Sequence, residues 1–202
     1  MTNLLMIWLL QAPVAGLGVA LDNDYVRVTR DSAPCASATV RGCRDRVIVA
    51  LGNIDLRSGS SRRAMQRGDI AVFSSGESYQ APTTGHYLEV AFKPDHPAVP
   101  APRERILPTK NVVLHDGARL FAFEERLAVG ETRERHSHGL RVIIQLNKTR
   151  LQQWPDGEPE LLRDIDTTGV AFSPPVIHRV KNVGDLPLRG IVIEIKPTGP
   201  GR

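Results

Sequence analysis

The sequence lacks the features that identify several common classes of protein. No apolar run reaches the roughly 20 residues that a membrane-spanning helix needs, so no transmembrane span is expected. No catalytic nucleophile triad and no phosphate-binding glycine loop is evident. The dinucleotide fingerprint is also missing, because Gly16-Leu17-Gly18 lacks the third glycine. Only 5% of the residues are aromatic, and few of these lie in the densest basic stretches, Arg57 to Arg67 and Arg133 to Arg141. The basic residues behind the net charge of +4 are therefore expected to lie on a solvated surface, and no nucleic-acid partner is expected.

The composition that remains is that of a globular protein. Apolar residues make up 41% of the 202 residues and charged residues 24%. This length fits one large domain or two small ones, and each half would have about the usual size of an independent domain. Fifteen prolines and seventeen glycines indicate many turns.

Residues 1–20 have two interpretations. The apolar run Leu4 to Leu10 followed by Gly18-Val19-Ala20 fits a signal peptide with its cleavage site, but no Lys or Arg precedes the run. The alternative is an N-terminal arm packed on the fold. The redox state of Cys35 and Cys43 depends on which interpretation holds. They can form a disulfide in an exported (periplasmic or secreted) protein and would be ordinary thiols in the cytoplasm.

The rest of the chain reads as short β-strands separated by turns. Strands are expected at the following places: 25–30, 46–51, 70–73, 87–92, 119–125, 141–146, 150–154, 178–183 and 188–196. Turn signals such as Pro155-Asp156-Gly157 lie between them. Near-regular strand spacing without a helical period predicts an all-β sandwich or barrel. Five prolines between Pro94 and Pro108 predict a linker over residues 95–110.

The two sides of this linker resemble each other. Residues 46–51 match 141–146 at an offset of 95, residues 71–74 match 170–173 at an offset of 99, and Lys93-Pro94 matches Lys196-Pro197 at an offset of 103. A slowly growing offset is what loop insertions in a duplicated domain produce. We therefore expect two tandem barrels, over residues 21–94 and 111–197.

Three histidines of the second half carry the most informative pattern. On a strand, residues i and i+2 point to one face, so His136 and His138 place two imidazoles about 7 Å apart at their α-carbons. Such a pair can close on one metal ion, and His178, at the start of a later strand, can add a third ligand. The alternative is that the pair lies near a strand start by chance and that His178 caps a loop.

These residues resemble the motifs of the cupin superfamily. The first motif is Gly, five residues, His-x-His, three or four residues, Glu, six residues, Gly, and Gly130, His136 and His138 match it. The second motif ends with His, three residues and Asn, as in His178 and Asn182. The resemblance implies two tandem jelly-roll barrels, and in many cupins the motif histidines and glutamate hold a divalent metal.

The departures from the motifs are also informative. The glutamate is replaced by Val142 or Ile143, the closing glycine is missing with Thr149 near its place, and Pro175 replaces the glycine before the second-motif histidine. The expected ligand set is therefore three histidines, with Glu134 as a possible fourth ligand. Three neutral imidazoles leave the full +2 charge on a metal ion, which favours an anionic ligand. The candidate metals are Fe, Zn, Mn, Ni and Cu.

Arginines flank the histidines. Arg133, Arg135 and Arg141 can hold an anionic substrate, but the odd numbers of Arg133 and Arg141 place them opposite His136 in strand parity. Most of this cluster is therefore expected to face solvent.

The first half has lost the histidines. The repeat places Arg41, Cys43 and Tyr79 at the positions of His136, His138 and His178. This half is predicted to be structural, with an organic ligand held by Arg41 and Tyr79 as the alternative. Exposed sheet edges suggest a homodimer.

Three functions remain open after the sequence alone. One is a metal-dependent enzyme acting on a small molecule, of the oxygenase, isomerase or hydrolase type. The second is a non-catalytic small-ligand binding protein, and the third is a structural protein with a vestigial site. A hollow barrel around the three histidines would separate the first two from the third.

Overall fold

The computed structural model describes residues 18–37, 39–40, 43–107 and 111–197, and all secondary structure in these ranges is β-strand. The prediction of an all-β fold is therefore confirmed. No helix long and apolar enough to cross a membrane occurs in the described ranges. Of the segment 1–20, residues 1–17 lie outside the described part, and Val19–Ala20 belong to the first strand.

The described part of the N-terminal half contains seven strands. They are β1 (Val19–Asp22), β2 (Val26–Arg30), β3 (Arg46–Ala50), β4 (Ile54–Ser58), β5 (Ser61–Met65), β6 (Ile70–Phe73) and β7 (Tyr87–Phe92). Five of them form a sheet in the order β1-β2-β7-β3-β6, and β4 and β5 form a separate hairpin.

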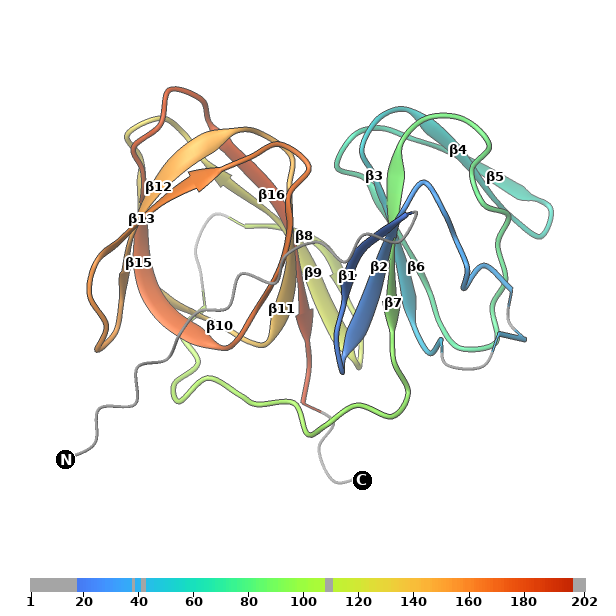
Figure 1. Ribbon diagram of the computed structural model, residues 1–202, viewed down its shortest axis with the longest axis horizontal. Coiled ribbons are helices and arrows are strands. Elements are labelled where there is room, and N and C mark those ends of the chain that lie inside the picture. The colour runs from blue at the N-terminus through green and yellow to red at the C-terminus, as the bar shows by residue number, and fades with distance from the viewer. Residues whose placement is uncertain (1–17, 38, 41–42, 108–110, 198–202) are drawn as a thin grey trace.

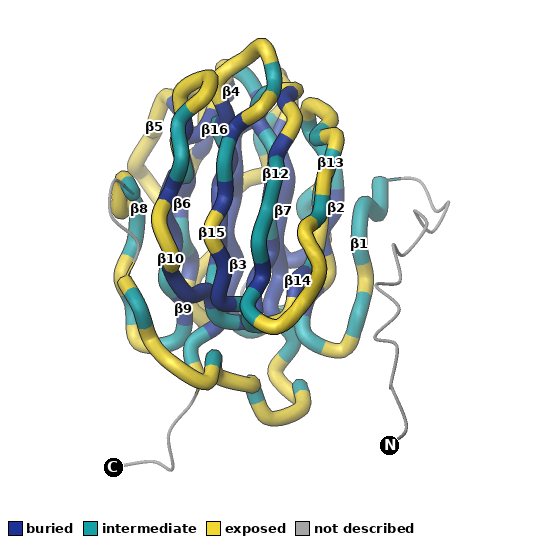
Figure 2. Tube along the Cα trace, turned by 90° about the vertical axis from the view of Figure 1, so that its left-hand side faces the viewer, coloured by how far each residue is buried: buried dark blue, intermediate teal, exposed yellow. Residues whose placement is uncertain are grey.

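The C-terminal half contains nine strands. They are β8 (Val112–Asp116), β9 (Leu120–Leu127), β10 (Thr132–His138), β11 (Arg141–Gln145), β12 (Thr149–Pro155), β13 (Leu161–Ile165), β14 (Val170–Ser173), β15 (Val176–Asn182) and β16 (Leu188–Ile195). They form a five-stranded sheet, β14-β11-β16-β9-β8, and a four-stranded sheet, β10-β15-β12-β13. Figure 1 shows the two sheets curving around a common interior, and Figure 2 views the four-stranded sheet face-on.

Strand pairing shows how far the two halves correspond. Arg46 of β3 pairs with Phe73 and Ala91, and Arg141 of β11 pairs with Ser173 and Glu194. These pairs give offsets of 95, 100 and 103. The first and last agree with the sequence matches, but the match of residues 71–74 to 170–173 at an offset of 99 is wrong by one residue. A one-residue slip in a strand reverses which side chains face inward.

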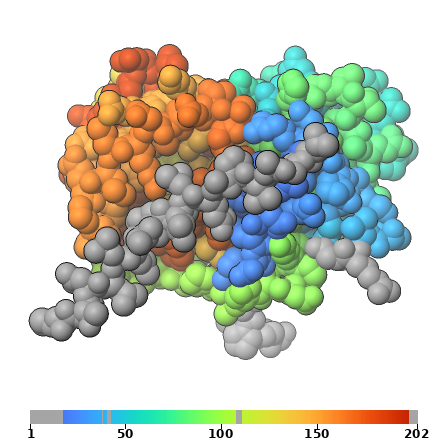
Figure 3. Space-filling view, in the orientation of Figure 1, coloured from blue at the N-terminus to red at the C-terminus, as the bar shows by residue number. Residues whose placement is uncertain are grey.

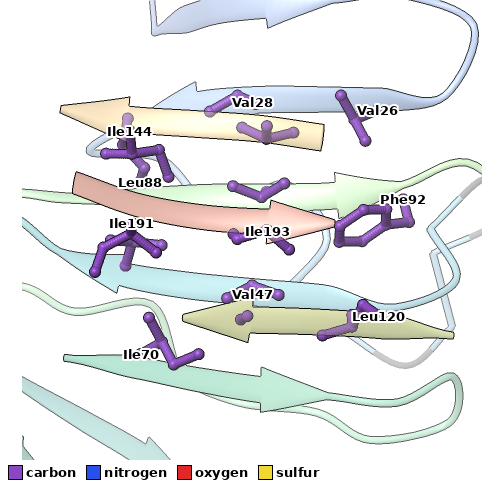
Figure 4. Close-up of a cluster of buried hydrophobic side chains, with 14 of the residues drawn as sticks. Val26, Val28, Val47, Ile70, Leu88, Phe92, Leu120, Ile144, Ile191 and Ile193 are labelled. Atoms are coloured by element: carbon purple, nitrogen blue, oxygen red, sulfur yellow. The ribbon is translucent and has the colours of Figure 1, made fainter. Parts of the chain in front are cut away.

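The largest apolar core lies between the two halves. The inward and outward alternation of β3, β7, β11 and β16 sends one aliphatic row of each sheet toward the other sheet (Figure 4). The fully buried members include Val47, Leu88, Ile144, Ile191 and Ile193. The two five-stranded sheets therefore pack face to face, as in a β-sandwich, and each barrel depends on the other for the cover of one sheet.

The interior of the N-terminal half is filled by side chains. A second core cluster there includes Ile48, Met65, Phe73, Tyr79 and Tyr87. Tyr79 stacks on Phe73 with 4.4 Å between ring centroids, and its hydroxyl donates to buried Glu89. This packing agrees with a structural role for the N-terminal half. Arg41, part of the alternative ligand site, lies outside the described residues.

The proline-rich linker is tied to the C-terminal half. Its described residues form no strand, and Ile106 and Ser137 of β10 exchange hydrogen bonds, including Ser137 N–H to the Ile106 carbonyl at 2.9 Å. Arg103 and Glu104 pair with Asp156 and Arg135, at 2.7 and 2.9 Å. The linker therefore runs along the outside of β10, under the two barrels in Figure 1.

Shortening Ile193 to Ala should destabilise both halves together. Ile193 is fully buried in the core between the sheets, and Ile→Ala at such positions costs about 2–5 kcal/mol of unfolding free energy. Urea denaturation followed by circular dichroism should show one transition at a lower midpoint. Val129→Ala, at a residue 56% exposed, is the control and should change little. Two transitions of which only one moves would contradict a shared core.

The structure joins Cys35 and Cys43 in a disulfide, with a sequence separation of 8. A loop of this length should contribute about 2–3 kcal/mol of stability by restricting the unfolded chain. The Cys35→Ser/Cys43→Ser double variant should therefore unfold at lower urea concentration than the oxidised protein. Two titratable thiols in the purified wild type, with equal stability of both proteins, would contradict this bond.

Candidate metal centre

Two neighbouring strands bring three histidines together. β10 and β15 run antiparallel, and His136 and His178 are direct partners in their register. His138 follows two residues after His136 and faces the same side. The ring centroid of His136 lies 4.7 Å from that of His138 and 4.6 Å from that of His178. All three residues are buried, and one nitrogen from each lies within 4.8 Å of the other two.

Hydrogen bonds fix which ring nitrogen of two histidines faces the centre. Nδ1 of His136 is 2.7 Å from the Glu134 carbonyl, which can only accept, so Nδ1 carries the proton. Nδ1 of His138 is 2.9 Å from the Glu194 carboxylate and donates to it. In the neutral rings, Nε2 is therefore a bare acceptor. The nitrogens of His178 are buried without a hydrogen-bond partner.

The two bare nitrogens face each other at close range. Nε2 of His136 and Nε2 of His138 are 3.0 Å apart. Two lone pairs repel at this distance unless a cation lies between them. Two nitrogens each about 2.1 Å from one metal ion, at a right angle, would be about 3 Å apart. The donor set and its spacing thus fit a divalent metal.

A proton is a poor substitute for that metal at neutral pH. Burial lowers the pKa of His136 to about 4 and that of His178 to about 2. Burial also holds the pKa of His138 well below its usual range, and the positive charge of Arg141 adds to this effect. The three rings are therefore neutral at pH 7, which is the form that binds metal.

No carboxylate joins the three nitrogens. The side chain of Glu134 is exposed and lies outside the cluster, and only its backbone carbonyl touches His136. Of the two residues at the expected place of the motif glutamate, Val142 points into the core between the sheets and Ile143 lines the cavity described below. An apolar side chain thus occupies the position from which the family motif would supply a carboxylate.

The expectation that Arg133 and Arg141 face solvent is wrong. They are only 3% and 6% exposed. The register of β10 against β15 shifts between Arg133 and His136, and such a bulge reverses the face on which residues before it lie. Arg141 begins a new strand, so its parity relative to His136 carries no information. Arg135 is exposed and pairs with Asp156 at 2.7 Å.

Two half-buried acids near the histidines, Glu125 and Glu194, were not found by sequence reasoning. Glu125 pairs with Arg133 at 3.0 Å, and Glu194 accepts from His138. Burial raises the pKa of both carboxyl groups, and the arginine charges oppose that shift. When Glu125, Glu194, Arg133 and Arg141 are all ionised, their charges cancel. An acid at position 194 inside the otherwise apolar run 190–195 was the signal for one of them.

A cavity of about 780 Å³ opens beside the histidines. His138, His178 and Arg141 belong to its lining, together with Glu125. Nη1 of Arg141 donates to the carbonyls of Gly139 and Pro174, which holds the guanidinium in place. The C-terminal barrel is thus hollow where the N-terminal interior is packed with apolar side chains, and it can hold a small molecule next to the three imidazoles.

Comparison with known proteins gives structural likeness only. No protein-family model matches the sequence, and no significant match to a curated protein was found. A cupin 2 conserved barrel domain protein from Leptotrichia buccalis has 16% identity and a TM-score of 0.52, over 88% of this chain and 87% of its own.

Two further solved structures have similar scores. A putative glyoxylate-induced protein from Pseudomonas aeruginosa has 11% identity and a TM-score of 0.56, over 91% and 85% of the two chains. A formate complex of oxalate decarboxylase from Lactobacillus farciminis has 12% identity and a TM-score of 0.55, over 89% and 84%. Because these likenesses extend over both halves of the molecule, this chain has the fold of the cupin superfamily.

Proposed function

We propose that the C-terminal barrel binds one divalent metal ion through His136, His138 and His178. The observation that carries this proposal is the pair of bare Nε2 atoms 3.0 Å apart in a buried site. When bound, the metal would polarise a coordinated oxygen or activate a bound water. Imidazole donors suit Zn, Fe, Cu and Ni. Mn also serves as a catalytic metal ion in proteins.

The protein residues around the histidines have separate tasks in this proposal. Glu194 and the Glu134 carbonyl hold the rings of His138 and His136 with Nε2 inward, as outer partners of metal-binding histidines commonly do. When Glu125, Glu194, Arg133 and Arg141 are all ionised, their charges cancel, and the +2 charge of the metal would be left for the ligand to balance. An anionic small molecule in the cavity, such as a carboxylate or enolate, meets this need, and Arg141 lines the same cavity.

An enzyme of the oxygenase, isomerase or hydrolase type is the finer form of the proposal. A non-catalytic binding protein remains the second candidate, because Ile143 occupies the place of the motif glutamate. A homodimer also stays a prediction. The edge strand β8 presents Val112 and Val113, 42% and 57% exposed, as the surface such a partner would cover.

Metal content tests the proposed site directly. Protein purified without a histidine tag should contain about one metal ion per chain by elemental analysis, and His138→Ala should lose most of it. His86→Ala is the matched control, because His86 is exposed and pairs with Asp31 away from the cluster. Absence of metal after reconstitution under reducing conditions, or equal loss in the control, would refute the proposal.

The affinity for metal should resist mild acid. Protons compete with a metal only below the pKa values of the free rings, which burial has lowered to about 4 for His136 and about 2 for His178. Affinity should therefore stay nearly constant from pH 7 to about 5 and fall below that. An oligohistidine peptide, whose rings titrate near 6.5, is the control and should lose affinity from pH 7 downward. A decline in the folded protein that parallels the peptide would contradict the buried site.

A further inference from the structure

The wall of the cavity is built partly by the N-terminal half. The turn between β1 and β2 contributes Asn23, Asp24 and Tyr25 to the lining of the same cavity that holds His138 and His178. Figure 3 shows blue residues of the N-terminal half next to orange residues of the C-terminal half. The cavity is therefore shared between the two barrels, and the N-terminal one has a part in it besides its structural role.

Hydrogen bonds fix the shape of this turn and tie strand β2, which follows it, to the C-terminal half. The side-chain oxygen of Asn23 accepts from the backbone N–H groups of Tyr25 and Val26, at 2.9 and 3.0 Å. Nη2 of Arg30 donates to the Thr168 carbonyl at 2.8 Å, across the boundary between the halves. The turn is held in place before any ligand arrives, so the wall it forms can discriminate among ligands.

Tyr25 forms an aromatic pair with the other half. Its ring stacks on Phe172 of β14, with centroids 5.6 Å apart and an angle of 24° between the planes. The Tyr25 hydroxyl donates to the Ala98 carbonyl at 3.3 Å. Both rings line the cavity and can contact a flat apolar group there.

The cavity lining is mixed. Its apolar side chains include Ile143, Leu151, Val176, Val180 and Val192, and its polar ones, besides the histidines and Arg141, include Gln153, Arg163 and Asp164. A volume of about 780 Å³ is in the range of pockets for drug-sized molecules, and far exceeds what an acid of two or three carbons fills. A very small acid would leave the apolar walls in contact with water.

We infer that the ligand of this cavity is an organic anion with an apolar, ring-sized body, and that Tyr25 is a specificity-determining residue for that body. The inference rests on the proposed metal site for the anionic end, which lies near His138, His178 and Arg141. The body runs along the aliphatic walls, and its far end packs against Tyr25 and Phe172. Selectivity for the body thus comes from both barrels, while affinity for the anion comes from one.

A series of carboxylates tests this assignment on the full-length, cobalt-loaded protein. Acetate, phenylacetate, 3-phenylpropanoate and 4-phenylbutanoate are titrated by isothermal calorimetry, with the visible cobalt absorption reporting coordination. At least one phenyl acid should bind about tenfold or more tightly than acetate, because it buries its ring. Tyr25→Ala should weaken that acid about 3- to 10-fold while leaving acetate affinity and cobalt content unchanged.

Conservative variants separate stacking from folding. Tyr25→Phe keeps the ring and should retain wild-type affinity for the phenyl acid, and Phe172→Ala should reproduce the loss from the other half. If Tyr25→Ala does not fold, Tyr25→Leu and Phe172→Ala carry the test.

The outcomes distinguish the two proposals. Normal cobalt loading with phenyl acids no tighter than acetate, or with equal affinity in Tyr25→Ala and Phe172→Ala, would overturn this inference and leave the metal site intact. Failure to load cobalt, with Tyr25-dependent binding of the phenyl acids, would refute the metal site and support the aromatic wall.

Discussion

The packing of two aliphatic sheet faces is the constraint on which the rest of the structure depends. Strands alternate their side chains, so the rows of β11 and β16 that meet the N-terminal sheet leave the opposite rows facing the C-terminal interior. Val142 and Ile144 are fully buried between the sheets, and their neighbours Arg141 and Ile143 line the cavity. Because the shared core supplies much of the apolar burial, the interior of the C-terminal barrel can contain charged side chains and a cavity.

Within that interior, two histidine nitrogens face each other at a distance that a metal ion between them would stabilise. The Nδ1–H group of His138 donates to Glu194, and that of His136 donates to the Glu134 carbonyl. These hydrogen bonds keep the two Nε2 atoms facing inward, 3.0 Å apart. Burial removes protonation as an answer at neutral pH. When ionised, Glu125 and Glu194 balance the charges of Arg133 and Arg141, so the preference for an anion would come from the metal itself. The N-terminal half completes the arrangement with the β1–β2 turn, which lines part of the cavity.

Much of the fold and the histidine cluster could be predicted from sequence, because both follow from short-range periodicity. His136 and His138 share a face by their spacing, and the apolar runs mark the central strands. Strand β5 was missed because four of its five residues are exposed and its apolar alternation is absent. The burial of Arg133 depends on a bulge, and the place of Tyr25 in the cavity lining depends on contacts between the halves. The periodicity of the sequence predicts neither of these features.

X-ray absorption spectroscopy of the metal-loaded protein tests the central claim most directly, because it counts the ligands of the ion. The structure predicts three imidazole nitrogens at about 2.0–2.1 Å for zinc, with the remaining positions filled by oxygen from water or an added carboxylate. A spectrum with fewer than three imidazoles, or one unchanged between the wild type and His178→Ala, would show that the metal is bound elsewhere and would contradict the account.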